Sequence, residues 1–165
     1  MVLLATGVTP AADDVAGLRR EADRGVRVDA GMRCAPGVYA AGGVARFPLS
    51  DQEAACIEHW RVAQQQGRIA AYHTLGAGRR YDDVPFLWTY HYEQRVDYLG
   101  HASRWNRIEI DGHPNAQDFI AYFLRDEQVA AVLACQRQPL TAALRVALRT
   151  PLSWPAAQRL TAAMR

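Results

Sequence analysis

Two consecutive glycines, Gly42 and Gly43, follow a short apolar segment that begins at Val38. This pattern predicts a strand that ends in a tight corner, after which a new element begins. Neither glycine has a Cβ atom, so the backbone at the corner can approach a ligand closely. Backbone N–H groups that open at such a corner suit a phosphate or a polyol chain. An ordinary tight turn is the alternative interpretation of the glycine pair.

The first 78 residues combine short apolar segments with one long helical pattern. The expected elements are strands at 2–5, 26–29 and 37–41, a helix at 13–22 capped by Asp13 or Asp14, a turn at 33–36 and a polar connection at 50–56. From Trp60 to Leu75, small or apolar residues recur every three or four positions, which predicts one face of a helix. Gly67 lies on that face, and close packing against a sheet or a cofactor would offset its poor helix propensity. Gly76 and Gly78 are expected to end the helix.

In residues 79–165, strand patterns come first and helix patterns follow. Extended segments are expected at 86–98, 107–111, 119–124 and 129–134, with a hairpin turn at 125–128 and helices at 140–148 and after Ser153. Strands followed by helices indicate an antiparallel α+β layer. We therefore predict an α+β fold in two domains, residues 1–78 and 79–165.

Charge and composition exclude several classes of protein. The net charge is +2 and no block of like charges occurs, so the sequence gives no indication of nucleic-acid binding. No apolar run reaches the roughly 18 residues of a membrane span, and the first five residues are too short for a signal peptide. The cytoplasm is the expected compartment. Three widely spaced cysteines and five scattered histidines predict reduced, largely buried thiols and no metal site.

Several segments, taken in order, resemble the closing part of the FAD-dependent pyridine nucleotide-disulfide oxidoreductases. The nearest subgroup comprises the ferredoxin/rubredoxin reductases and the apoptosis-inducing-factor-like proteins. The matching segments are residues 5–10, 25–29, 38–45 and 58–68, and residues 85–92 resemble the opening of that subgroup's C-terminal domain. The resemblance implies a partial FAD-domain segment, with short strands and one long helix. An antiparallel-sheet C-terminal reductase domain with terminal helices is expected to follow.

The resemblance also implies two dinucleotide-binding units upstream of the matching region. Each would carry a Gly-x-Gly-x-x-Gly fingerprint at a helix N-terminus, and this sequence contains none. Gly76-Ala77-Gly78 follows a helical pattern, so we interpret it as a helix C-cap and loop. The chain is thus expected to be about the last 40% of a reductase. Activity is expected to need an N-terminal half, supplied by another chain or by a longer gene product, and the expected partners are that half or further copies of the chain.

By resemblance, FAD is the cofactor and NAD(P)H the co-substrate. The cofactor-binding candidates are Thr6, Gly7, Gly42, Gly43, Val44, Glu58, His59, Trp60 and Trp88. Gly43 stands where the family usually has an aspartate that binds the ribityl chain, so one charge-assisted hydrogen bond is lost. Trp60 is expected to stack on a flavin or nicotinamide ring, and Glu58 to accept from the carboxamide. The alternative is that Trp60 anchors the helix in the core and Glu58 pairs with the helix dipole.

Trp88 lies where relatives place an aromatic pair near the flavin, although aromatic residues are also common in any strand. The implied function is electron transfer from NAD(P)H through FAD to a ferredoxin-like acceptor. Two alternatives stay open: a non-catalytic docking or dimerisation module, and the product of a truncated reading frame. The residue that selects NADH or NADPH would lie upstream.

Overall fold

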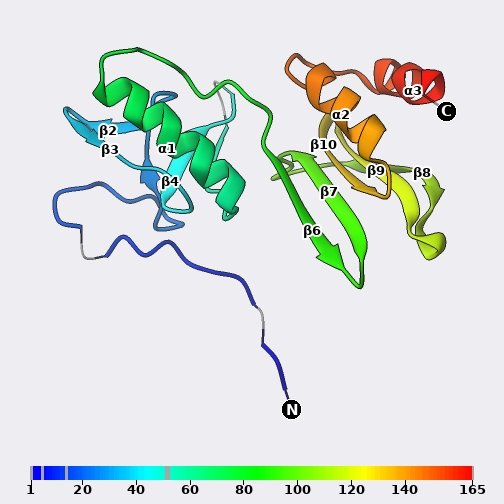
Figure 1. The fold of residues 1–165 in the computed structure, drawn as a ribbon, viewed down its shortest axis with the longest axis horizontal. Helices are drawn as coiled ribbons and strands as arrows, with labels where there is room; N and C mark the ends of the chain where they lie inside the picture. The colour runs from blue at the N-terminus through cyan, green and yellow to red at the C-terminus, as the bar shows by residue number, and fades with distance from the viewer. Residues whose placement is uncertain (1, 5, 14, 51–52, 165) are drawn as a thin grey trace. The chain divides into compact units, whose positions relative to one another are not determined.

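The computed structural model describes residues 2–4, 6–13, 15–50 and 53–164. Backbone contacts divide the chain into two compact units, Met1–Asp82 and Asp83–Arg165, named the first and second units below. Short strands and one long helix form the first unit, whereas the second contains an antiparallel sheet followed by two helices (Figure 1). The α+β fold class predicted from the sequence is confirmed.

The first unit holds several very short strands. They are β1 (Val26–Arg27), β2 (Arg33–Ala35), β3 (Val38–Tyr39), β4 (Ala45–Pro48) and β5 (Ala54–Ala55). β4 lies between β1, which is parallel to it, and β5, which is antiparallel. β2 and β3 form a separate antiparallel pair.

The helix predicted over 60–75 is confirmed as α1 (Trp60–Thr74). Its predicted packing face is wrong, because Val62 and Gln66 are the fully buried side chains. Trp60 is 62% exposed. A Cβ added at Gly67 would meet nothing within 4 Å, so this glycine serves no close contact. The spacing of small residues identified a helix but not the side that packs.

Two predictions near the N-terminus are wrong. Residues 2–4 form no strand and are more than 80% exposed, while Ala5 lies outside the described residues. A strand buried on both faces needs neighbouring strands, and the described part of the chain supplies none for this segment. The predicted helix at 13–22 is also missing from its described residues. Gly17 interrupts it with a φ of +79°, and three apolar positions give too little burial to hold so short a helix. Asp14, the alternative cap, lies outside the described residues.

Further differences concern the strand boundaries. Of the turn predicted over residues 33–36, residues 33–35 form strand β2 instead, and the chain turns at Pro36 and Gly37. The segment interpreted as a polar connection contains β5, and the short strands at 26–29 and 37–41 shrink to two residues each. Such short strands are defined by their partners rather than by local sequence.

The second unit contains a five-stranded antiparallel sheet in the order β6-β7-β10-β9-β8. Its strands are β6 (Phe86–His91), β7 (Gln94–Gly100), β8 (Arg107–His113), β9 (Asp118–Arg125) and β10 (Gln128–Cys135), with a short 3-10 turn, η1 (Pro114–Ala116), between β8 and β9. The extended segment predicted over 86–98 is a hairpin, because Tyr92 and Glu93 turn the chain with positive φ angles. The β9–β10 hairpin is confirmed.

Two C-terminal helices, α2 (Gln138–Ala147) and α3 (Trp154–Ala163), pack against this sheet. Leu140 and Leu144 of α2 join Leu99 of β7 and Val132 of β10 in one hydrophobic core. The Tyr122 hydroxyl on β9 lies 2.6 Å from Oγ1 of Thr161 on α3, and this buried hydrogen bond fixes the last helix. The hydrophobic effect and paired polar groups thus hold the helices on one face.

Candidate functional site

The Gly42–Gly43 corner is built around a left-handed backbone conformation. Gly42 has a φ of +87°, which side-chain-bearing residues rarely adopt. Its carbonyl accepts a hydrogen bond from the Ala45 N–H at 2.8 Å, which closes the turn. The Val44 carbonyl accepts from the Val26 N–H at 2.8 Å, so the corner is attached to β1. The sequence prediction of a tight corner here agrees with this geometry.

The corner rests against the first half of α1. The Gly42 N–H donates to Oε1 of Gln66 at 2.7 Å, and a Cβ added at Gly42 would lie 3.4 Å from that of Ala63. A Cβ added at Gly43 would lie 3.5 Å from Cγ of Glu58, so the Glu58 side chain lies beside the corner. Residues 42 and 66 are far apart in the sequence, and folding brings them together.

Backbone donors remain open at the corner. Among the described residues, the N–H groups of Gly43 and Val44 make no hydrogen bond. Gly43 is half-buried, and the absence of a side chain leaves its backbone accessible. Two consecutive unbonded N–H groups beside a carboxylate can bind an oxygen-rich ligand that also carries hydroxyl groups.

The beginning of α1 borders the same corner. His59 is the N-cap residue, and its Nδ1 accepts from the Arg61 N–H at 3.2 Å. The His59 and Trp60 rings lie 5.7 Å apart, centroid to centroid. Because Trp60 is 62% exposed, the interpretation that it anchors the helix in the core is wrong. An exposed indole at a helix N-terminus offers a flat surface for an aromatic ligand.

The remaining predicted site residues lie elsewhere. Thr6 and Gly7 are exposed in a stretch with neither helix nor strand, and a Cβ added at Gly7 would meet nothing within 4 Å. Trp88 belongs to β6 of the second unit. Its ring lies 5.5 Å from that of Phe86, and the Arg95 guanidinium lies 5.3 Å from its centroid. Of the predicted residues, Gly42, Gly43, Val44 and Glu58 lie together at the corner, and His59 and Trp60 follow Glu58 at the start of α1.

Gln66 is the residue at the corner that sequence reasoning missed. It is completely buried, and only its carbonyl oxygen is paired among the described residues. Its burial could have been inferred from its position four residues after Val62, which places both residues on the same side of the helix. Two other glutamines precede it directly, and the sequence alone does not distinguish which of the three is buried.

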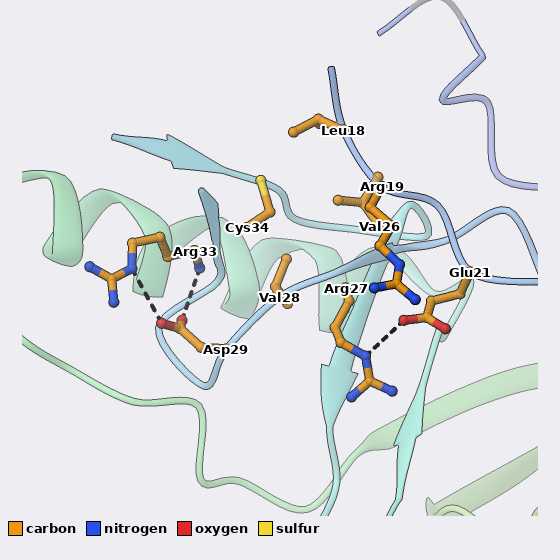
Figure 2. Close-up of a pocket in the computed structure, with 9 residues that line it drawn as sticks. All are labelled: Leu18, Arg19, Glu21, Val26, Arg27, Val28, Asp29, Arg33 and Cys34. Carbon is orange, nitrogen blue, oxygen red and sulfur yellow. Dashed lines mark hydrogen bonds and ion pairs between the residues drawn. The ribbon is translucent and has the colours of Figure 1, made fainter. Parts of the chain in front are cut away.

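A separate pocket of about 650 Å³ lies beside β1 and β2 in the first unit (Figure 2). Its lining residues are Leu18, Arg19, Glu21, Val26, Arg27, Val28, Asp29, Arg33 and Cys34, none of which the sequence singled out as a cofactor contact. Arg27 pairs with Glu21 at 2.8 Å and Arg33 with Asp29 at 3.4 Å. These pairs neutralise most of its charge.

The described residues contain neither a metal-binding cluster nor a membrane-spanning helix. No group of three or more His, Cys, Asp or Glu side chains lies close enough together to bind a metal ion. Within the same residues, none of the helices combines the length and apolar character needed to span a bilayer.

Comparison with known proteins gives two family matches that together span most of the chain. Residues 1–67 match the pyridine nucleotide-disulphide oxidoreductase family, and residues 86–164 match the reductase C-terminal family. Apoptosis-inducing factor 3 of Mus musculus is 32% identical over 107 residues, which cover 64% of this chain and 18% of that protein. The ferredoxin–NAD(+) reductase component of the anthranilate 1,2-dioxygenase system of Burkholderia cepacia is 32% identical over 138 residues, which cover 81% of this chain and 34% of that protein.

A solved structure, the covalent complex of putidaredoxin reductase with putidaredoxin, shares the fold. It matches with a TM-score of 0.81 and 24% identity, over 95% of this chain and 40% of that one. The chain thus spans 18% and 34% of these two curated relatives and 40% of the solved chain. The family resemblance and the fold predicted from the sequence are both confirmed. The chain belongs to the pyridine nucleotide-disulphide oxidoreductases with a reductase C-terminal domain, and it corresponds to their C-terminal portion.

Proposed function

We propose that this chain is part of a flavoprotein reductase that passes electrons from NAD(P)H through FAD to a ferredoxin-like acceptor. The named ferredoxin–NAD(+) reductase and the putidaredoxin reductase complex support this class of reaction and partner. When bound, FAD would take a hydride from NAD(P)H and pass electrons on singly. The chain's own residues would hold and orient that cofactor. Residues 1–78 would bind the cofactor, and residues 79–165 would form the C-terminal reductase domain. The protein would act in the cytoplasm.

The observation that carries the proposal is the corner beside the beginning of α1. The free N–H groups of Gly43 and Val44 would donate to oxygen atoms of FAD. The Glu58 carboxylate, which lies beside Gly43, would accept from a ribityl hydroxyl or the nicotinamide carboxamide. The exposed Trp60 indole would stack on a ring. His59, which caps α1, would hold Trp60 in place. These residues fit one part of FAD.

The other predicted cofactor contacts, Trp88, Thr6 and Gly7, lie outside the corner. Trp88 would be the aromatic contact that the second unit contributes to the flavin. Thr6 and Gly7 would reach the cofactor only when another segment packs against their exposed stretch. The upstream part of a longer protein, or a second copy of the chain, would supply that segment.

We further propose that the isolated chain has no NAD(P)H-dependent reductase activity. Hydride transfer requires the two rings to be oriented at about 3–3.5 Å, and the sequence has no glycine fingerprint to hold either pyrophosphate. A ferricyanide assay with NADH or NADPH and added FAD tests this proposal. The expected rate equals that of free flavin with the same nucleotide, and faster turnover contradicts the proposal.

The cofactor site is tested by titrating the isotope-labelled chain with FAD and following its amide resonances. Weak binding is expected, with shifts confined to Gly43, Val44 and residues 58–61. The matched variants are Trp60→Leu and Trp105→Leu, since Trp105 is a half-exposed indole of the second unit. Only Trp60→Leu should weaken binding. Shifts that map to the pocket around Arg27 and Arg33, or no shifts at all, would overturn the site.

A further inference from the structure

Gln66 is an unusual residue for the interior of this unit. Its side chain is 0% exposed, although a glutamine amide is costly to bury unless both of its ends are paired. The other buried polar side chains, Asp97, Thr141 and Thr161, each make hydrogen bonds to other side chains. Gln66 pairs through Oε1, whereas its Nε2 has no partner among the described residues.

Within the described part of the chain, the one hydrogen bond of the Gln66 side chain goes to the glycine corner. Its Oε1 accepts from the Gly42 N–H at 2.7 Å, across 24 residues of sequence. The orientation of the amide follows from chemistry, because the Gly42 N–H is a donor and requires the carbonyl end. Without this acceptor, the buried N–H of Gly42 would lose its partner.

This bond holds the first residue of the corner. Gly42 has its carbonyl fixed by Ala45 and its N–H fixed by Gln66, so both of its backbone polar groups are held. Hydrogen bonds between described residues leave the next two N–H groups, those of Gly43 and Val44, available to a ligand. Holding the first residue of the corner therefore sets the direction in which the next two donors point.

We propose that Gln66 is a positioning residue that orients the Gly43 and Val44 N–H groups for the cofactor. This inference rests on the proposed function, because it takes FAD as the ligand of the corner. Gln66 itself acts through Gly42 and need not touch the ligand. A preorganised corner binds more tightly, because its donors do not have to be ordered when the ligand arrives.

The experiment compares Gln66→Met with Gln64→Met by amide hydrogen exchange and FAD titration. Methionine has a similar length and no hydrogen-bonding amide, and Gln64 is an exposed residue on the same helix. Gln66→Met should speed exchange of the Gly42 amide at least tenfold and weaken FAD binding about tenfold. Gln64→Met should change neither.

A conservative variant, Gln66→Glu, keeps the test valid if the methionine variant does not fold. In mildly acidic buffer a buried glutamic acid is neutral, and its carbonyl oxygen can still accept from Gly42. In Gln66→Glu, Gly42 exchange should be as slow, and FAD binding as tight, as in the unsubstituted chain. Unchanged Gly42 exchange in Gln66→Met, or faster exchange with unchanged FAD affinity, overturns the positioning role. If the unsubstituted chain binds no FAD, the cofactor site proposed at the corner fails, and the positioning role fails with it.

Discussion

The hydroxyl of Thr141 on α2 lies 3.0 Å from Oδ2 of Asp97 on β7, and both side chains are almost fully buried. The other carboxylate oxygen of Asp97 accepts from Nε of Arg95 at 2.7 Å. The sheet and its covering helix are therefore joined by a charged group whose two oxygens are both paired. Such a group is stabilising only while its partners remain.

Replacing Asp97 by alanine should destabilise the protein by roughly 2–4 kcal/mol, because the Thr141 hydroxyl and the Arg95 guanidinium lose their shared partner. Urea unfolding followed by circular dichroism measures the change. The matched control is Glu109→Ala, since Glu109 pairs with Arg107 on the same sheet but is 39% exposed. That pair should be worth less than about 1 kcal/mol. Equal effects of the two substitutions would contradict the role given to Asp97.

Gly100 ends β7 with a φ of +74°, and a Cβ added there would lie 2.6 Å from the Ala130 carbonyl oxygen. It faces the irregularity between Val129 and Ala131 in β10. Gly100→Ala should therefore cost about 2–3 kcal/mol, from both the strained φ and the backbone clash.

Gly67→Ala provides the contrasting case, because Gly67 is helical and has open space around it. This substitution should stabilise the protein by about 0.5–1 kcal/mol through helix propensity. Thermal unfolding should show a lower midpoint temperature for Gly100→Ala and a higher one for Gly67→Ala. A loss of stability in Gly67→Ala would mean that this face of α1 is packed in solution.

Only part of this structure could be predicted from the sequence. α1 and the β9–β10 hairpin were predictable because their patterns are long or depend on a local turn. Residues 2–4 looked like a buried strand, but strand pairing depends on partners far away in the sequence. The proximity of Glu58 to Gly43, and of Gln66 to Gly42, is likewise non-local. The sequence therefore identified the corner and the helix start but missed the side chain that joins them.

Burial, with the nearby Asp23 carboxylate, raises the pKa of the Cys56 thiol from 9.0 to about 11. The folded state therefore holds this proton more tightly than the unfolded state does. The associated stability is fully present below pH 9 and is lost as the pH rises toward 11. Chemical unfolding at several pH values should show this decline.

Thiol alkylation provides a direct test of the same shift. At pH 8 the thiolate fraction of Cys56 should be about a hundred times smaller in the folded protein than in the denatured one. Peptide mapping after iodoacetamide treatment separates Cys56 from Cys34 and Cys135. Equal alkylation rates for Cys56 in folded and denatured protein would show that the thiol is not protected.

The first unit should be the more readily cleaved part of the chain. Its strands span only two to four residues, and its early segment has neither helix nor strand around the Arg19–Arg20 peptide bond. Local opening there exposes few buried contacts, so it costs little free energy. Brief trypsin digestion should cut near Arg19 and Arg20 before the sheet of the second unit. A stable fragment of residues 1–78 with cleavage inside the sheet would contradict this expectation.

Gly43→Asp should tighten FAD binding, because Gly43 has room for a side chain. An added Cβ would make an ordinary contact of 3.5 Å with Cγ of Glu58, and Gly43 does not have a positive φ. Folding stability should stay within about 0.5 kcal/mol. The new carboxylate adds a charge-assisted hydrogen bond worth roughly 1.5–3 kcal/mol, or about ten- to a hundredfold in affinity.

The neighbouring Glu58 reduces that gain, since two carboxylates beside one corner repel each other. The double variant Gly43→Asp, Glu58→Gln separates this repulsion from the loss of any bond that Glu58 makes to FAD. If repulsion dominates, the double variant should bind more tightly than Gly43→Asp alone; if it binds more weakly, Glu58 itself contributes to the cofactor site. Gly42→Ala is the matched control, because its φ of +87° makes any side chain strained, at a cost of about 1–3 kcal/mol. Unchanged or weaker FAD binding by both aspartate variants would mean that the cofactor meets this corner from another direction.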